Sequence, residues 1–92
     1  MASVTVELPS LLAQLMNGAS TLELEADTLA GALRALVAQH AILGVHLFDE
    51  AGALRRHVLC FHNDTNTRWL DSTDVPVRDG DTITIMQAVS GG

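Results

Sequence analysis

Hydrophobic and polar residues alternate over residues 3–8, where valine and leucine occupy every second position. A period of two is typical of a strand with one buried face. The alternation returns over residues 21–25, with leucines expected to point inward and glutamates outward. An Asn-Gly turn signal lies between the two segments. The pattern therefore predicts a hairpin whose connection, residues 9–20, is irregular and longer than a tight turn.

The period changes to that of a helix after residue 26. Asp27 and Thr28 are residue types that cap helix N-termini. The apolar positions that follow are spaced as on one face of a helix: Leu29, Ala32, Leu33, Leu36, Val37 and His40. We therefore predict a helix over residues 29–40, followed by an irregular connection over residues 41–56.

The second half of the chain predicts further strands. Residues 55–62 are rich in Val, Leu, Cys and Phe, and the polar turn 63–66 follows them. Residues 67–70 are predicted to form a short edge strand, and residues 75–77 to be extended. The last strand, residues 81–86, alternates strictly after a turn that contains Asp-Gly-Asp.

The predicted order of elements is ββαβββ, which indicates an α+β fold. We expect a mixed sheet of four to five strands with one main helix packed on one face. The strongly alternating first and last strands would pair in parallel at the centre of that sheet. This is the β-grasp arrangement. Residues 1–86 would form the β-grasp domain, and residues 87–92 a flexible C-terminal tail that ends in Gly-Gly.

Composition narrows the function classes. A chain of 92 residues supports one small core, and an enclosed active-site cavity is not expected. The formal net charge of −6 argues against nucleic acid or an anionic membrane as partner. No apolar run approaches the roughly 20 residues that span a bilayer, and the first residues do not resemble a signal peptide. We expect a cytoplasmic protein that is a monomer when free.

Conventional catalysis is poorly supported by the sequence. The single cysteine, Cys60, excludes an internal disulfide or a cysteine-based metal centre, and its position within a strand predicts a buried side chain. The four histidines lack the spacing of a metal site, and no nucleotide-binding or nucleophile motif occurs. We predict that the chain is not an enzyme and binds neither a cofactor nor a metal.

The last two residues, Gly91 and Gly92, carry the chemistry that the sequence does suggest. A tail without side chains can enter a narrow channel that larger residues would block. The α-carboxylate at its tip is ionised at neutral pH and is a poor electrophile until another enzyme activates it. A terminal Gly-Gly alone is a weak signal. Following the last strand of a predicted β-grasp domain, it is far more specific.

The whole chain resembles the ubiquitin-like sulfur-carrier family, which includes the small subunit of molybdopterin synthase and the thiamine-pathway carrier (MoaD/ThiS-like). The resemblance is strongest in residues 79–85, DGDTITI, running into residues 88–92, AVSGG. The opening strand, the start of the helix at Asp27-Thr28-Leu29 and the Asn63-Asp64 turn are also similar. Residues 47–63 look most like the longer-looped, CysO-like carriers that feed sulfur to cysteine biosynthesis.

The resemblance implies a mechanism. A ubiquitin-activating-like adenylyltransferase and sulfurtransferase would adenylate the Gly92 carboxylate, using its own ATP and magnesium. A sulfur donor would displace AMP and leave a thiocarboxylate on Gly92, with Gly91 providing clearance for the tail. A downstream sulfur-accepting synthase would then use that sulfur. The product could be cysteine, a cofactor or another sulfur-containing metabolite.

A docking surface is predicted from the strand periods. If the helix covers Val58 and Cys60, then Leu59 and Phe61 lie on the open face of the sheet. Met86 would join them, forming an exposed apolar patch beside the tail. Coverage of this patch by residues 41–56 or by a second copy is the alternative. The predicted partner-binding residues are Leu59, Phe61, Met86, Ala88, Val89 and Ser90.

Two other functions remain open at this point. The chain could be a protein modifier that is joined through Gly92 to lysines of target proteins. It could also be a small structural subunit of a heteromeric synthase. Because the carrier and modifier chemistries diverge only after adenylation, the sequence barely separates them.

Overall fold

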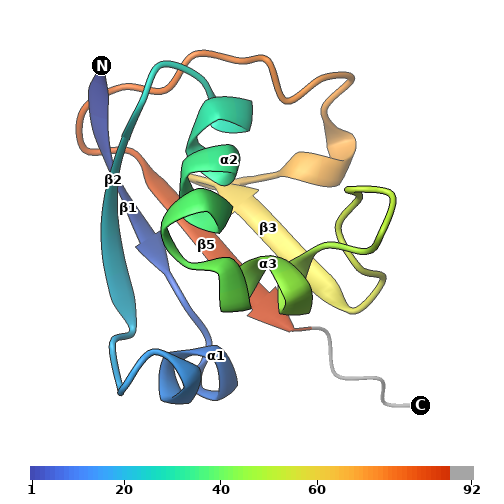
Figure 1. The fold of residues 1–92 in the computed structure, drawn as a ribbon. Helices are drawn as coiled ribbons and strands as arrows, with labels where there is room; N and C mark the ends of the chain where they lie inside the picture. Colours follow the sequence, from blue (N-terminus) through green and yellow to red (C-terminus); the bar gives the residue numbers. More distant parts are fainter. Residues whose placement is uncertain (88–92) are drawn as a thin grey trace.

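Five strands form one mixed sheet in the order β2-β1-β5-β3-β4 in the computed structural model, which describes residues 1–87 (Figure 1). The strands are β1 (Ala2–Glu7), β2 (Thr21–Ala26), β3 (Val58–His62), β4 (Thr65–Asn66) and β5 (Thr82–Gln87). The first and last strands pair in parallel at the centre, and the neighbouring pairs β1–β2, β3–β5 and β3–β4 are antiparallel. The predicted β-grasp sheet is confirmed.

The helices are α1 (Ser10–Leu15), α2 (Leu29–Gln39) and α3 (Ala41–Leu47), with a short 3-10 helix, η1, at Thr67–Trp69. The longest, α2, crosses one face of the sheet, and α3 turns away from it at 120° (Figure 1). The start of α2 agrees with the prediction, since the Thr28 hydroxyl accepts a hydrogen bond from the Gly31 amide at 3.0 Å.

The core lies between α2, α3 and the sheet. The inward-facing residues of all four longer strands contribute to it, together with the apolar stripe of α2. Its fully buried large side chains are Leu12, Leu29, Leu36, Leu43, Leu47, Ile83, Ile85, Val4, Val6, Val58 and Cys60. Burial of each such aliphatic side chain contributes about 1.5–3 kcal/mol, which fixes the strand register and therefore the two faces of the sheet.

Two segments predicted to be irregular are helical. Within residues 9–20, α1 buries Leu12 and Ala13. Within residues 41–56, α3 buries Leu43 and Leu47, which are one helical turn apart. The prediction of an irregular connection was wrong there because Gly44 is a poor helix former on its own. The glycine instead permits close packing, since a Cβ at this position would lie 2.8 Å from Cγ1 of Val37.

Strand boundaries also differ from the prediction: β1 covers residues 2–7 instead of 3–8, β2 ends one residue later than predicted, and the differences in the second half of the chain are larger. β3 begins at Val58 rather than at residue 55, and residues 67–69 form η1 instead of an edge strand, which is β4. The reason for η1 is local: the Asn66 side chain accepts a hydrogen bond from the Arg68 amide at 3.0 Å and bends the chain. β5 is shifted by one residue, so that Gln87, assigned to the tail by the sequence pattern, is its last residue.

Candidate functional site

The C-terminal strand β5 pairs with two neighbouring strands, β1 and β3, along its first half and with β3 alone along its second half. Its ladder with β1 extends from Thr82 to Thr84, whereas its ladder with β3 continues to the pair Val58–Gln87. The chain therefore leaves the domain from a central strand, anchored to the start of β3. The predicted tail residues Ala88, Val89, Ser90, Gly91 and Gly92 lie outside the described residues.

The predicted apolar patch is assembled on the face of the sheet turned away from α2. Leu59 of β3 and Met86 of β5 are direct cross-strand partners. Phe61 lies on the same face, opposite Thr84. The side chain of Met86 is 47% exposed, while Leu59 and Phe61 are half-buried. The residue positions agree with the predicted docking surface, whose role as an interface stays a prediction.

Residues 41–56 do not cover this patch. Leu43 and Leu47 of α3 belong to the same core cluster as Val58 and Cys60, on the α2 face of the sheet. The segment therefore packs on the opposite side from Leu59. Of the two alternatives to an exposed patch, coverage by residues 41–56 is thus contradicted by the structure.

A groove beside the last residues of β5 extends the patch toward α1. Its lining includes Pro9 and Leu11 from the start of α1, together with Met86 and Gln87. Leu11 is 63% exposed, so it adds apolar surface to this groove. The sequence analysis missed this residue because residues 9–20 were expected to be irregular. A helical reading would have separated the buried Leu12 from the exposed Leu11.

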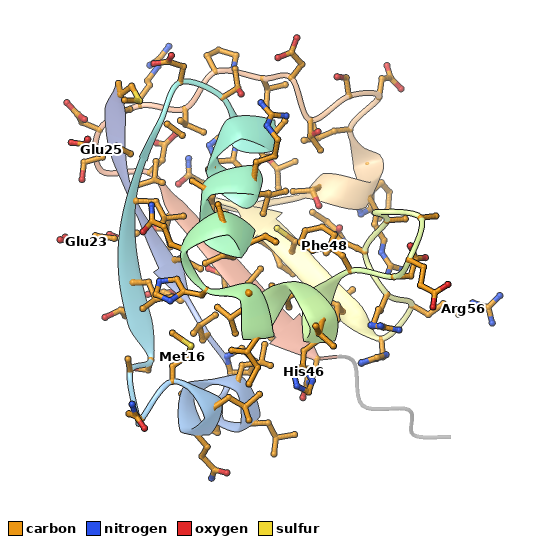
Figure 2. All side chains as sticks on the ribbon, viewed as in Figure 1. Met16, Glu23, Glu25, His46, Phe48 and Arg56 are labelled. Carbon is orange, nitrogen blue, oxygen red and sulfur yellow. The ribbon has the colours of Figure 1, made fainter. Side chains whose placement is uncertain are left out.

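The other half of the same face is acidic. β1 and β2 direct Glu7, Glu23 and Glu25 toward solvent on this side of the sheet. Figure 2 shows Glu23 and Glu25 pointing away from the outer edge of β2. The Glu7 carboxylate accepts a hydrogen bond from the Thr84 hydroxyl at 3.2 Å, so the acidic half begins next to β5. An apolar area near the tail thus adjoins a carboxylate-rich area.

A family model described as the ThiS family matches residues 7–92, which is nearly the whole chain. The chain belongs to the ThiS family. It is 32% identical over 92 residues to the sulfur carrier protein CysO of Mycobacterium tuberculosis and to that of Mycobacterium bovis. The match covers 98% of this chain and 99% of each relative. The chain is therefore a homologue of a sulfur carrier protein.

Solved structures agree with this family membership. The crystal structure of Mycobacterium tuberculosis CysO superposes with a TM-score of 0.81 at 31% identity, covering 94% of this chain and 99% of that one. A structure described as the BexX/CysO complex of Amycolatopsis orientalis gives the same TM-score and identity, with coverages of 97% and 99%. The small archaeal modifier protein SAMP1 of Haloferax volcanii gives 0.80 at 28% identity, with coverages of 99% and 100%.

The Asp-Gly-Asp turn of this ThiS-family chain has a structural role. Asp79 accepts a hydrogen bond from the Ser3 amide at 2.7 Å, and the Gly80 amide donates to the Ser3 carbonyl at 2.9 Å. Gly80 has φ +88°, a conformation that favours glycine. The turn therefore ties the start of β1 to the start of β5, at the opposite end of β5 from the tail.

The last residue of this turn, Asp81, forms a pair that the sequence analysis missed. Its carboxylate lies 2.8 Å from Nε2 of His62 and accepts a hydrogen bond from the Arg78 amide at 2.9 Å. The bond to His62, followed by the bond from Arg78, lowers the pKa of Asp81 from 3.8 to about 2. The pair joins the ends of β3 and β5, so we assign it to stability.

Cys60 is fully buried in the core, as predicted. Burial raises the pKa of its thiol to about 11, so the thiolate that would act as a nucleophile is scarce at neutral pH. Over residues 1–87, no group of three or more His, Cys, Asp or Glu side chains is placed to hold a metal ion. Over the same residues, no single helix is long and apolar enough to cross a membrane. Together α2 and α3 have the length and apolar composition of a membrane span, but the chain bends by 120° between them.

Proposed function

We propose that the chain is a sulfur carrier whose working group is the carboxylate of Gly92. The observation that carries this proposal is the 32% identity, over 98% of the chain, to proteins named sulfur carrier protein CysO. The family match supports it further, because it runs through Gly91 and Gly92 at the end of the sequence.

The proposed chemistry takes place on the main chain. An oxygen of the Gly92 carboxylate attacks the α-phosphorus of ATP, pyrophosphate leaves, and an acyl-adenylate forms. A hydrosulfide then attacks the acyl carbon, the C–O bond to AMP breaks, and the thiocarboxylate remains. ATP and magnesium belong to the activating enzyme in this account. The chain itself is a protein substrate and not an enzyme.

The domain's part in this chemistry is to bind the partner enzymes. Ser-Gly-Gly at the end of the sequence offers few side chains for recognition, so most of the binding energy must come from surfaces of the folded domain. The apolar patch of Leu59, Phe61 and Met86 adjoins the last residues of β5 and is suited to this role. We propose it as the contact with the activating enzyme and with the sulfur-accepting synthase that follows.

The proposal is tested by intact mass spectrometry after incubation with ATP, magnesium, sulfide and a ThiS-type activating enzyme. We expect a mass gain equal to the difference between a sulfur and an oxygen atom. A chain lacking Gly92 serves as the control, because it keeps every helix and strand of the domain and its terminal carboxylate is displaced by one residue. Conversion of the control at the same rate as the full chain would contradict the proposal.

A second candidate function is protein modification through Gly92. The structural similarity to the small archaeal modifier protein SAMP1, with a TM-score of 0.80, supports this second function. In this case a lysine amine of a target protein would attack the acyl carbon of the adenylate, the C–O bond to AMP would break, and an isopeptide bond would form with loss of a proton. Lysine-linked adducts of the full chain in a cell lysate, absent with the chain lacking Gly92, would support the modifier.

A further inference from the structure

Charge is divided unequally along the chain. Residues 28–63 contain three of the five arginines, all four histidines and only two of the eleven carboxylates. This stretch forms α2, α3 and β3, while residues 1–27, which form β1, α1 and β2, have four carboxylates and no arginine. Figure 2 shows the consequence, with Glu23 and Glu25 on one side of the molecule and Arg56 on the other.

A groove with an apolar floor lies beside α2, α3 and the loop that follows α3. Val37 of α2, Val45 of α3 and Phe48, which follows α3, contribute to its lining. Val45 is 65% exposed, and Phe48 is half-buried between α2 and the loop that follows α3 (Figure 2). The close approach of the two helices at Gly44 brings these side chains together. We call this surface the basic groove.

Three arginines at the rim give the basic groove its charge: Arg34, Arg55 and Arg68. Arg55 is positioned by its own backbone surroundings, because Nε donates to the Val45 carbonyl at 3.0 Å. Arg68 uses Nη2 to donate to the carbonyls of Arg55, Arg56 and Val58 at 2.9–3.1 Å. Within residues 1–87, no arginine forms an ion pair with a carboxylate.

Both carboxylates of residues 28–63 are also at the rim, and they leave the charge of the arginines available. Asp49 accepts hydrogen bonds from the Ala51 and Ala53 amides at 2.9 and 3.0 Å, so its carboxylate stabilises the turn that follows α3. Glu50 is exposed beside it. Among the charged side chains that line the groove, three arginines outnumber these two carboxylates, so the lining carries a small net positive charge.

We propose that the basic groove is a docking site for an acidic, amphipathic segment of the activating enzyme. Apolar side chains of that segment would occupy the floor formed by Val37, Val45 and Phe48. Its carboxylates would bind the rim arginines, a geometry for which guanidinium groups are well suited. The inference rests on the proposed function, and it adds a second contact on the opposite side of the sheet from the apolar patch.

The acidic segment belongs to an enzyme rather than to a second copy of this chain. A second copy would offer Glu23 and Glu25 of the edge strand β2, and this head-to-tail contact would build a ring or a filament rather than a symmetric dimer. Two copies would each bring a net charge of −6 into such a contact. The activating enzyme, in contrast, must hold the folded domain while the short tail reaches its active site.

The test compares Arg34→Glu with Arg78→Glu in thiocarboxylate formation by the activating enzyme at low ionic strength. Both side chains are exposed, and both variants change the net charge equally, but Arg78 lies in the turn before β5. We expect Arg34→Glu to raise KM about tenfold with kcat unchanged, and Arg78→Glu to raise it less than about twofold. Arg34→Gln should fall between wild type and Arg34→Glu.

Apolar variants of α3 test the floor of the groove independently. Val45→Ser should raise KM, while Ile42→Ser, on the same helix but outside the groove, should not. Thermal unfolding of each variant checks that the fold is retained. Equal KM values for Arg34→Glu and Arg78→Glu would overturn the docking site while leaving the proposed function intact. Failure of the wild-type chain to form a thiocarboxylate would instead overturn the proposed function and the docking site with it.

Discussion

Leu59 of β3 and Met86 of β5 are direct cross-strand neighbours on the face of the sheet that is turned away from α2. Their pairing follows from the register that places Cys60 opposite Ile85 in the core, because successive side chains alternate between the two faces. The same register extends to Gln87, the last described residue. The packing of the core thus determines which apolar side chains are presented next to the tail.

Met86→Asp should weaken binding to the activating enzyme without unfolding the domain. The side chain is 47% exposed, so the change places a charge in the apolar patch and not in the core. We expect the dissociation constant to rise by about tenfold or more, measured by titration calorimetry. Ile42→Asp is the matched control, because Ile42 is 45% exposed and lies on α3. An equal loss of affinity in the two variants would remove the patch from the account.

Gly44→Ala should destabilise the domain through contact with Val37. The added Cβ would lie 2.8 Å from Cγ1 of Val37, and such overpacking costs about 1–3 kcal/mol. The gain in helix propensity of about 1 kcal/mol offsets only part of it. In a Val37→Ala background the contact is absent, so Gly44→Ala should then stabilise. Urea unfolding of wild type, the two single variants and the double variant measures both effects, and equal changes in the two backgrounds would refute the contact.

The pair of Asp81 and His62 should make stability depend on pH in the acidic range. The pKa of Asp81 is lowered from 3.8 to about 2, so the unfolded chain binds the proton more tightly than the folded one. Its contribution is complete above about pH 4 and is lost as the pH falls toward 2. Asp81→Asn should cost about 1–2 kcal/mol at neutral pH. The difference between wild type and variant should shrink from pH 4 to pH 2, and a constant difference would contradict the assignment.

Cys60→Ala should leave sulfur transfer unchanged. The thiol is fully buried, and its raised pKa of about 11 keeps it protonated at neutral pH. We expect the variant to form the thiocarboxylate at the wild-type rate. In the native wild-type chain, iodoacetamide should react with Cys60 far more slowly than after unfolding in guanidinium chloride. A loss of thiocarboxylate formation in a folded Cys60→Ala chain would show that sulfur passes through the side chain.

The sheet could be predicted because its strands alternate and its centre is strongly patterned. Val4 and Val6 on the first strand and Ile83 and Ile85 on the last are all buried in the structure. The apolar patch followed from the same alternation. Short helices could not be predicted in this way, since α1 has six residues and α3 seven, lengths at which tertiary contacts decide helix formation.

Features that depend on contacts between distant segments also could not be predicted from the sequence. The basic groove needs α2, α3 and the following loop to meet, and the pairing of His62 with Asp81 joins residues 19 positions apart. The net charge of −6 averages over the chain and does not show where the charged side chains lie. The structure separates the carboxylates of β1 and β2 from the arginines near α2, α3 and β3, and a partner with surfaces of both signs would complement this division.

The position of the transferred sulfur tests the central claim most directly. The chain is incubated with the activating enzyme, ATP and sulfide, and the product is fragmented in the mass spectrometer. We predict that the mass gain lies on the C-terminal fragment containing Gly92 and equals the replacement of one oxygen by one sulfur. An unchanged Gly92 fragment, with no mass gain or with the gain on a fragment that lacks Gly92, would contradict the account.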